Sequence, residues 1–196
     1  MLQRKKSIFT PAEYLGMEEK TDYKSEYYNG EIFAMAGGTP DHNSIAVNLA
    51  GELRQLLRHK PCRVFTSDLR LLVERSGLYT YPDAMVICGK IQLVEGRTDT
   101  VTNPILIVEV LSESTRDYDR GTKFNFCKQI PTLQEYILVE SEKPLVECFR
   151  RADGDKWTME MYEGLDALAR LESIESETES PRGIALRDIY DKVSWL

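Results

Sequence analysis

One short stretch of this sequence constrains the fold more than any other. Residues 105–111 are isoleucine, leucine and valine around a single carboxylate, Glu109. Such a run is typical of a β-strand that is buried on both faces. An ionised carboxylate inside it loses several kcal/mol of solvation unless a bound cation or a fixed positive side chain compensates it. The segment that follows offers three positive side chains, those of Arg116, Arg120 and Lys123.

A second acidic residue precedes another apolar run. Asp83 follows a Tyr-Pro pair and leads into residues 84–87, Ala-Met-Val-Ile. Proline lacks an N–H, so it suits the very start of a strand. Two carboxylates on neighbouring strands, with a lysine from the next helix, are typical of metal-assisted phosphodiester chemistry. Asp83 and Glu109 would supply hard oxygen ligands to Mg²⁺ or Mn²⁺, and a backbone carbonyl near Val110 and water would complete an octahedron.

Three segments carry a family resemblance: residues 108–112 (Val-Glu-Val-Leu-Ser), residues 117–124 (Asp-Tyr-Asp-Arg-Gly-Thr-Lys-Phe) and the Glu-Tyr pair at 135–136. In this order and spacing they resemble the Uma2-like family of endonucleases, which belongs to the PD-(D/E)xK, or restriction-endonuclease-like, superfamily. The resemblance covers nearly the whole chain, from residues 26–30 to residues 189–190. It implies an α/β (α+β) fold with a central mixed β-sheet, flanking helices and an N-terminal β-hairpin.

The resemblance also implies a function, which is Mg²⁺-dependent hydrolysis of phosphodiester bonds in DNA. The third motif position after Glu109 is Leu111, where the superfamily usually has lysine, and the family pattern places that lysine on the following helix, at Lys123. Lys123 would orient or deprotonate the attacking water, or neutralise charge in the transition state. By the same resemblance Glu26 is an accessory acid that supports the ligands or binds a second cation. His42 is a residue beside the site.

Each of these residues also has a plainer structural interpretation. Glu26 lies just before the Asn-Gly turn at 29–30 and could be a surface carboxylate on an edge strand. His42 could cap or pack at the start of a helix. Asp119 and Lys123 are spaced i,i+4 and could form a surface ion pair worth a few tenths of a kcal/mol.

Two other functions compete with the nuclease. A catalytically inactive nuclease fold that binds nucleic acid or protein is favoured by the acidic composition and by Leu111. Metal binding at Asp83 and Glu109 would separate this module from an enzyme. A hydrolase of sugars would need the two acids ~5–10 Å apart without a metal, and the neighbouring lysine argues against it.

The charge distribution limits which binding partners the protein can have. The 196 residues fit one domain, 1–196, and carry a net charge of −7. Residues 153–196 contain eleven acidic and five basic residues, whereas residues 52–75 contain six basic and three acidic ones. Phosphate contacts need a basic surface. The sequence therefore predicts weak, salt-sensitive DNA binding through Arg54, Arg58 and Arg63, and no strong non-specific binding of duplexes.

The cysteines and the absence of targeting signals predict the cellular compartment. The four cysteines form no C-x-x-C pair, which predicts buried, reduced thiols rather than a metal or redox site. The basic N-terminus lacks the apolar region of a signal peptide, and no apolar run approaches the ~20 residues of a membrane helix. These features predict a cytoplasmic protein with no membrane contact. The sequence allows either a monomer or a homodimer.

Periodicity and turn signals predict the remaining architecture. The strands that carry Asp83 and Glu109 should be neighbours in one mixed sheet, flanked by helices at 45–57 and 117–129. The other predicted elements are a helix from residue 11 to about 16, a hairpin of 25–28 and 31–35, strands 63–66 and 68–74 paired with each other, a loop at 90–102, strands at 134–140, 144–150, 157–162 and 168–180, and a helix at 184–193.

Overall fold

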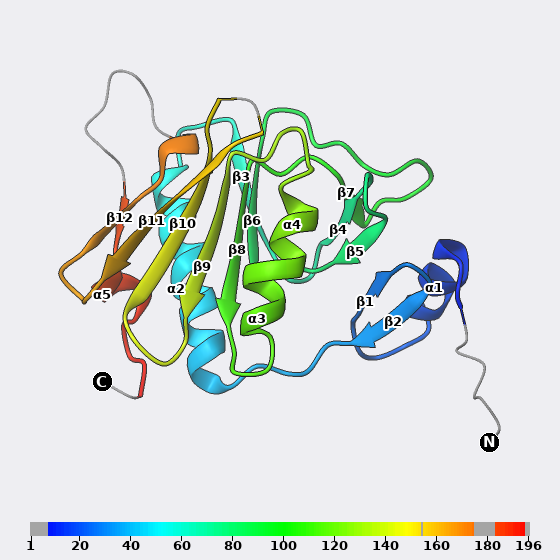
Figure 1. The fold of residues 1–196 in the computed structure, drawn as a ribbon, viewed down its shortest axis with the longest axis horizontal. Helices are drawn as coiled ribbons and strands as arrows, with labels where there is room; N and C mark the ends of the chain where they lie inside the picture. Colours follow the sequence, from blue (N-terminus) through cyan, green and yellow to red (C-terminus); the bar gives the residue numbers. More distant parts are fainter. Residues whose placement is uncertain (1–7, 154, 175–182, 195–196) are drawn as a thin grey trace.

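The computed structural model describes residues 8–153, 155–174 and 183–194 as a mixed α+β fold (Figure 1). The helical elements are α1 (Pro11–Glu18), α2 (Pro40–Leu56), α3 (Arg116–Tyr118), the π-helix η1 (Asp119–Lys123), α4 (Phe124–Cys127), the 3₁₀ turn η2 (Glu172–Ile174) and α5 (Leu186–Ile189). The strands are β1 (Ser25–Tyr28), β2 (Glu31–Ala34), β3 (Cys62–Thr66), β4 (Arg70–Val73), β5 (Leu78–Thr80), β6 (Ala84–Cys88), β7 (Thr100–Val101), β8 (Leu106–Leu111), β9 (Glu135–Glu140), β10 (Leu145–Arg151), β11 (Trp157–Glu163), β12 (Leu168–Arg170) and β13 (Gly183–Ala185).

The larger sheet has six strands in the order β11-β10-β9-β8-β6-β3. Strand β8 lies near its centre, and all six of its residues are buried. It pairs antiparallel with β6, where Ala84 is opposite Val108, and parallel with β9. The predicted mixed sheet, with the Asp83 and Glu109 strands as neighbours, is therefore confirmed.

Helices cover both faces of this sheet (Figure 1). Helix α2 packs its Ile45, Leu49 and Leu53 stripe against one face, together with Val108 and other even-numbered residues of β8. Ile107 and its odd-numbered neighbours on β8 face the other side, where α4 packs. Successive side chains of a strand point to opposite faces. Glu109 therefore projects toward the α3–η1–α4 segment, away from α2.

A second sheet of five strands is built mainly from the N-terminal part of the chain, in the order β2-β1-β5-β4-β7. The predicted hairpin forms its β1–β2 pair, with Asn29 at a positive φ of 48° in the turn. Tyr14 of α1 stacks on Tyr27 with ring centroids 5.1 Å apart, and Tyr79 packs against both. This tyrosine cluster holds α1 and β1 on β5, and β5 leads directly into Asp83.

Two predicted strands do not pair as expected. Strand β3 pairs with β6 in the larger sheet, whereas β4 pairs with β5 and β7 in the smaller one. The amide of Leu69 donates to the Thr66 carbonyl in a turn between them. This turn takes the chain from the larger sheet to the smaller one. The alternation of apolar and polar residues therefore predicted the two strands correctly, but the predicted pairing between them is wrong.

Three other boundaries differ from the sequence prediction. The predicted loop at 90–102 contains β7, and Leu93 forms a bridge with Val101. The predicted strand at 168–180 is β12 followed by η2, and residues 175–182 lie outside the described part of the chain. The predicted helix at 184–193 begins as strand β13, and only residues 186–189 are helical.

The predicted helix at 117–129 begins at residue 116 and is continuous as far as residue 127, but it is not α-helical throughout. Residues 119–123 form a π-helix between the short segments α3 and α4. Such wide turns are rare and are often found at functional sites. Both end residues of the π segment, Asp119 and Lys123, are buried.

The cysteine prediction was wrong for one pair. Cys62 and Cys88 lie directly opposite each other on β3 and β6 and form a disulfide. Cys127 and Cys148 are free and buried, as expected. The sequence prediction missed the bond because residues 26 positions apart become neighbours only through strand pairing. In the described part of the chain, no helix has the length and apolar character needed to cross a membrane.

Candidate active site

Asp83 is fixed to the neighbouring strand by its side chain. Its Oδ2 accepts a hydrogen bond of 2.8 Å from the backbone amide of Val110. The Nε2 atom of His42, at the start of α2, lies 3.0 Å from the Val110 carbonyl and 3.6 Å from the same Asp83 oxygen. Asp83 and His42 therefore hold both polar groups of one backbone residue, which is the residue after Glu109.

The partner of the buried Glu109 carboxylate is Lys123. Its Nζ lies 2.8 Å from Glu109 Oε1, and each side chain is only 4% exposed. The contact is an ion pair, and within the described ranges no other donor meets Glu109 Oε1 with hydrogen-bond geometry. Arg116 and Arg120, the other two candidates, pair instead with the carboxylates Glu140, Glu142 and Glu147.

Glu26 reaches the same ammonium from the smaller sheet. Its Oε1 lies 3.2 Å from Lys123 Nζ and accepts a short hydrogen bond from the Thr80 hydroxyl. Its Oε2 accepts a hydrogen bond of 2.9 Å from the Tyr118 hydroxyl. Glu26 is buried on β1, which lies between β2 and β5 and is not an edge strand. The interpretation of Glu26 as a surface carboxylate is therefore wrong.

Asp119 is a fourth acidic group that the sequence analysis did not place in the site. Its Oδ1 lies 3.5 Å from Lys123 Nζ, and both side chains are almost fully buried. The i,i+4 pair expected at the surface thus exists, but inside the molecule. The spacing was the available signal, and it was assigned to the wrong environment because the burial of this helix face depends on the smaller sheet.

The electrostatics of the cluster are those of excess negative charge. Burial raises the pKa of Glu109 well above its ordinary value, against the opposing effect of Lys123 and with help from the charges of Asp119 and Asp83. Burial likewise raises the pKa of Asp119. The pKa of Glu26 is lowered, because Lys123 and the hydroxyl donors together outweigh its burial. The pKa of Lys123 is raised despite burial, because three carboxylates face its ammonium.

One ammonium therefore faces three carboxylates, those of Glu26, Glu109 and Asp119, and the charge of a fourth, Asp83, acts on Glu109. This composition fits a hard divalent cation, which prefers carboxylate and carbonyl oxygens. A ready cage is absent, however: no three His, Cys, Asp or Glu side chains within the described residues converge as metal ligands. Lys123 lies among the carboxylates, and the Val110 carbonyl is already bonded to His42.

The sequence of residues 11–187 matches the model of the Uma2 family, described as "Putative restriction endonuclease". This chain belongs to the Uma2 family. Two uncharacterized proteins of Synechocystis sp. (strain ATCC 27184 / PCC 6803 / Kazusa) are each 38% identical to it. One, sll1609, matches over 160 residues, 82% of this chain and 90% of the relative. The other, slr1290, matches over 159 residues, 81% of this chain and 83% of the relative.

A solved structure shares the fold of this Uma2 protein. The crystal structure of a "putative nuclease belonging to DUF820" from Anabaena variabilis ATCC 29413 superposes with a TM-score of 0.74. It covers 93% of this chain and 97% of its own length at 21% identity. At that identity the likeness concerns the fold alone, which confirms the architecture expected from the sequence.

The predicted DNA-binding arginines of this Uma2 protein lie away from the acidic cluster. Arg54, Arg58 and Arg63 are exposed. Arg58 follows the C-terminal end of α2, sixteen residues after His42, or roughly 24 Å along a helix at 1.5 Å per residue. Arg63 is opposite Ile87, near the end of β6 remote from Asp83. The structure therefore does not bring these arginines to the carboxylates.

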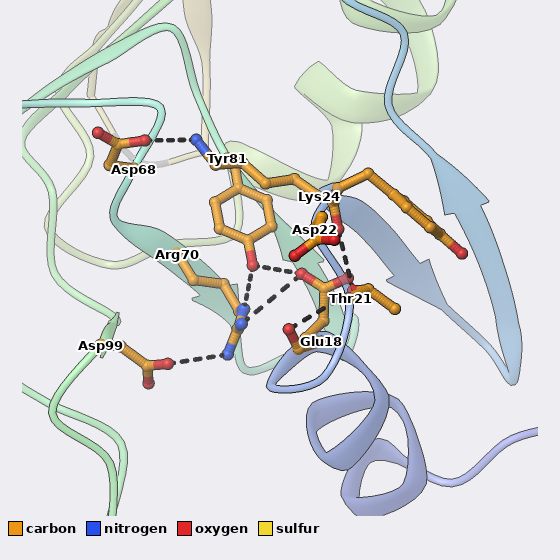
Figure 2. Close-up of a pocket in the computed structure, with 9 residues that line it drawn as sticks. Glu18, Thr21, Asp22, Lys24, Asp68, Arg70, Tyr81 and Asp99 are labelled. Carbon is orange, nitrogen blue, oxygen red and sulfur yellow. Dashed lines mark hydrogen bonds and ion pairs between the residues drawn. The ribbon is translucent and has the colours of Figure 1, made fainter.

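A separate pocket of about 220 Å³ lies where the end of α1 and the segment after it meet Arg70 of β4 and Tyr81 (Figure 2). Arg70 lines it and donates to the Tyr81 hydroxyl at 2.8 Å, with Asp99 and Glu18 at 3.4 and 3.7 Å. The neighbouring Thr80 instead donates to Glu26 in the acidic cluster. The pocket and the cluster are therefore distinct. Four acidic side chains line the pocket against two basic ones, those of Lys24 and Arg70.

Proposed function

We propose that this Uma2 protein is a divalent-cation-dependent endonuclease that hydrolyses phosphodiester bonds of DNA. The observation that carries the proposal is the charge imbalance around Lys123, where one buried ammonium faces three carboxylates and a fourth lies nearby. Buried charges are retained where they are paired or where they bind a metal. A divalent cation would neutralise the charge that the lysine leaves uncompensated.

Asp83 and Glu109 would hold this cation, with the Val110 carbonyl and water as further ligands. These are oxygen donors, which favours Mg²⁺ or Mn²⁺. A cation bound there polarises the scissile phosphate and lowers the pKa of a bound water. His42 contributes by orienting the groups around it, because its Nε2 contacts both the Val110 carbonyl and Asp83.

Lys123 would face the reacting phosphate. Its ammonium would orient the attacking water or stabilise the charge that develops on the phosphate oxygens as the phosphorus–oxygen ester bond breaks. Water supplies both parts of the product: its hydroxide joins the phosphorus, and the leaving sugar oxygen takes up a proton from solvent as it departs. Glu26 would act through the lysine, because both its oxygens already accept hydroxyl donors from Thr80 and Tyr118. This favours support of Lys123 over binding of a second cation.

The proposal is tested by incubating the purified protein with supercoiled plasmid and with a single-stranded RNA of defined length. Each substrate is given Mg²⁺, Mn²⁺ or EDTA. We expect cleavage of the plasmid that requires the cation and falls by about 10²-fold or more in Asp83→Asn and Glu109→Gln. Glu113→Gln is the matched control, because that carboxylate is exposed in the loop after β8. Cleavage that persists in EDTA or in Glu109→Gln would refute the proposed site, and cleavage of RNA alone would change the substrate.

A binding module without catalysis is the second candidate. It is favoured by the position of Lys123, which already lies within 2.8 Å of Glu109 as an internal counter-ion. Such a module would bind nucleic acid in EDTA as well as in Mg²⁺ and would cleave neither DNA nor RNA. Retained binding of DNA by Glu109→Gln, without cleavage by the parent protein, would establish this alternative.

A further inference from the structure

The three contacts of the Lys123 ammonium are not equivalent. Its Nζ lies 2.8 Å from Glu109, 3.2 Å from Glu26 and 3.5 Å from Asp119. An ammonium has three N–H donors, so it can face three carboxylates at once. The three acids come from three places in the fold: β8, β1 and the π-helix that carries the lysine itself.

The acids differ in how firmly they are held. Glu26 is fixed by the Thr80 and Tyr118 hydroxyls. Asp119 shares the π-helical segment with Lys123, and its backbone amide donates a hydrogen bond of 2.9 Å to the Thr115 carbonyl. Glu109 Oε1, in contrast, has no donor with hydrogen-bond geometry in the described part of the chain. Glu109 Oε1 thus faces the Lys123 ammonium without a hydroxyl donor of the kind that fixes Glu26, so Glu109 is the carboxylate at which we place the exchange of the ammonium for another cation.

The backbone under Asp119 is also fixed. The buried Tyr136 hydroxyl on β9 donates a hydrogen bond of 3.0 Å to the Asp119 carbonyl. The wide π turn brings Asp119 and Lys123 onto the same buried side of the helix. An anchor built in this way keeps its distance to the lysine when contacts on β8 change.

We propose that Asp119 is a positioning residue that, together with Glu26, retains the Lys123 ammonium in the site when a cation takes over Glu109. Without this anchor the displaced ammonium would compete with the cation for Glu109 or leave the cluster. The part of this inference that involves a cation rests on the proposed function. The retention of Lys123 does not, and it is tested without any metal.

The metal-free test removes the negative charge at position 109, which a bound cation would otherwise neutralise. In Glu109→Gln, labelled with ¹⁵N-lysine, the buried Lys123 ammonium should give an NMR signal that is protected from hydrogen exchange. Lys123 is the lysine that is buried among the described residues, so its signal is distinguishable. Adding Asp119→Asn should accelerate the exchange of this ammonium by more than tenfold.

Two controls separate loss of the anchor from loss of the fold. Asp119→Asn alone should keep the protected signal, because Glu109 and Glu26 still face the ammonium. Asp117→Asn, at an exposed position two residues away, should have no effect in the Glu109→Gln background. A protected signal in the Glu109→Gln/Asp119→Asn variant would overturn the proposal, as would loss of the signal in Glu109→Gln alone.

The second test measures Mn²⁺ affinity by electron paramagnetic resonance in a double-mutant cycle. Asp119→Asn should weaken Mn²⁺ binding about tenfold in the parent protein and have no effect in Lys123→Met, where no ammonium competes. Equal weakening in both backgrounds would make Asp119 a direct ligand and overturn its role through Lys123. If the parent binds no Mn²⁺, or Lys123→Met unfolds, the NMR comparison still decides the role of Asp119. Absence of Mn²⁺ binding would refute the proposed function separately.

Discussion

Lys123 Nζ lies 2.8 Å from Glu109 Oε1, and each of the two side chains is only 4% exposed to solvent. The two residues come from different elements, a central strand and the helix that follows it. Because neither charge can turn to water, each depends on the other and on the acids around them. The energetics are therefore those of a buried ion cluster, in which removal of one partner costs far more than at a surface.

Replacement of Lys123 by methionine should destabilise the protein strongly in the absence of divalent cations. The change leaves Glu26, Glu109 and Asp119 without their ammonium, and breaking a buried pair costs about 3–5 kcal/mol. Urea unfolding in EDTA measures the loss. Lys90→Met, at an exposed position, should change stability by less than about 0.5 kcal/mol.

A charge-balanced variant provides the stricter form of this prediction. Lys123→Met/Glu109→Gln removes one charge of each sign and should recover part of the stability lost in Lys123→Met. A loss of only about 0.3–0.5 kcal/mol in Lys123→Met would instead be the behaviour of a surface ion pair and would contradict the burial of the cluster.

The stability of Glu109→Gln relative to the parent should depend on pH. Burial raises the pKa of Glu109 well above its ordinary value of 4.5. At a pH between the pKa of the unfolded chain and the raised pKa of the folded protein, folded Glu109 therefore holds a proton that the unfolded chain has lost. Parent stability therefore falls as pH rises through this window. Glutamine does not titrate, so the free energy of unfolding of Glu109→Gln should rise relative to that of the parent as pH rises above about 4.5.

This pH dependence is measured by urea unfolding in EDTA at several pH values. Glu113→Gln, which alters an exposed carboxylate, is the control and should show no such trend. A constant or narrowing difference between Glu109→Gln and the parent would mean that Glu109 stays ionised in the folded protein.

The sequence predicted that Glu109 contacts a positive side chain, because an ionised carboxylate in an apolar strand is costly to bury without a partner. The need for a partner and the family pattern together pointed to Lys123 on the following helix and to the neighbouring strand that follows Asp83. The sequence did not predict Asp119, Thr80 or Tyr118 as parts of the cluster. Their contacts depend on a π-helix and on the pairing of β1 with β5, and spacing along the chain indicates neither.

The same limit explains the errors in the fold. Alternation of side chains locates β3 and β4 but carries no information about which sheet each strand joins. The Cys62–Cys88 bond likewise follows from strand register, which a single sequence does not determine. Arg70 is one of the six basic residues of the segment 52–75, yet it is buried against Tyr81 because β4 lies inside the smaller sheet.

Tyr136→Phe should destabilise the protein by about 1–3 kcal/mol, the usual cost of leaving a buried acceptor unsatisfied. Burial raises the pKa of Tyr136, so its hydroxyl stays protonated and donates to the Asp119 carbonyl at 3.0 Å. Thermal and urea unfolding measure the effect. Tyr23→Phe, at an exposed position, is the control and should be neutral. A neutral Tyr136→Phe would mean that water or a local shift satisfies the π-helix carbonyl.

Charge reversal at Arg58 and Arg63 should weaken DNA binding without altering the chemical step. Both side chains are exposed, and Arg58 follows the C-terminal end of α2, roughly 24 Å from His42 at 1.5 Å per residue. Each lost phosphate contact should flatten the slope of log affinity against log salt concentration by roughly one unit. Fluorescence anisotropy with a labelled duplex at several salt concentrations measures this slope, and cleavage at saturating DNA should stay within about twofold of the parent. Arg75→Glu, at an exposed turn of the smaller sheet, is the matched control. If Arg58→Glu/Arg63→Glu leaves the slope unchanged while Arg75→Glu flattens it, the duplex binds along the smaller sheet instead.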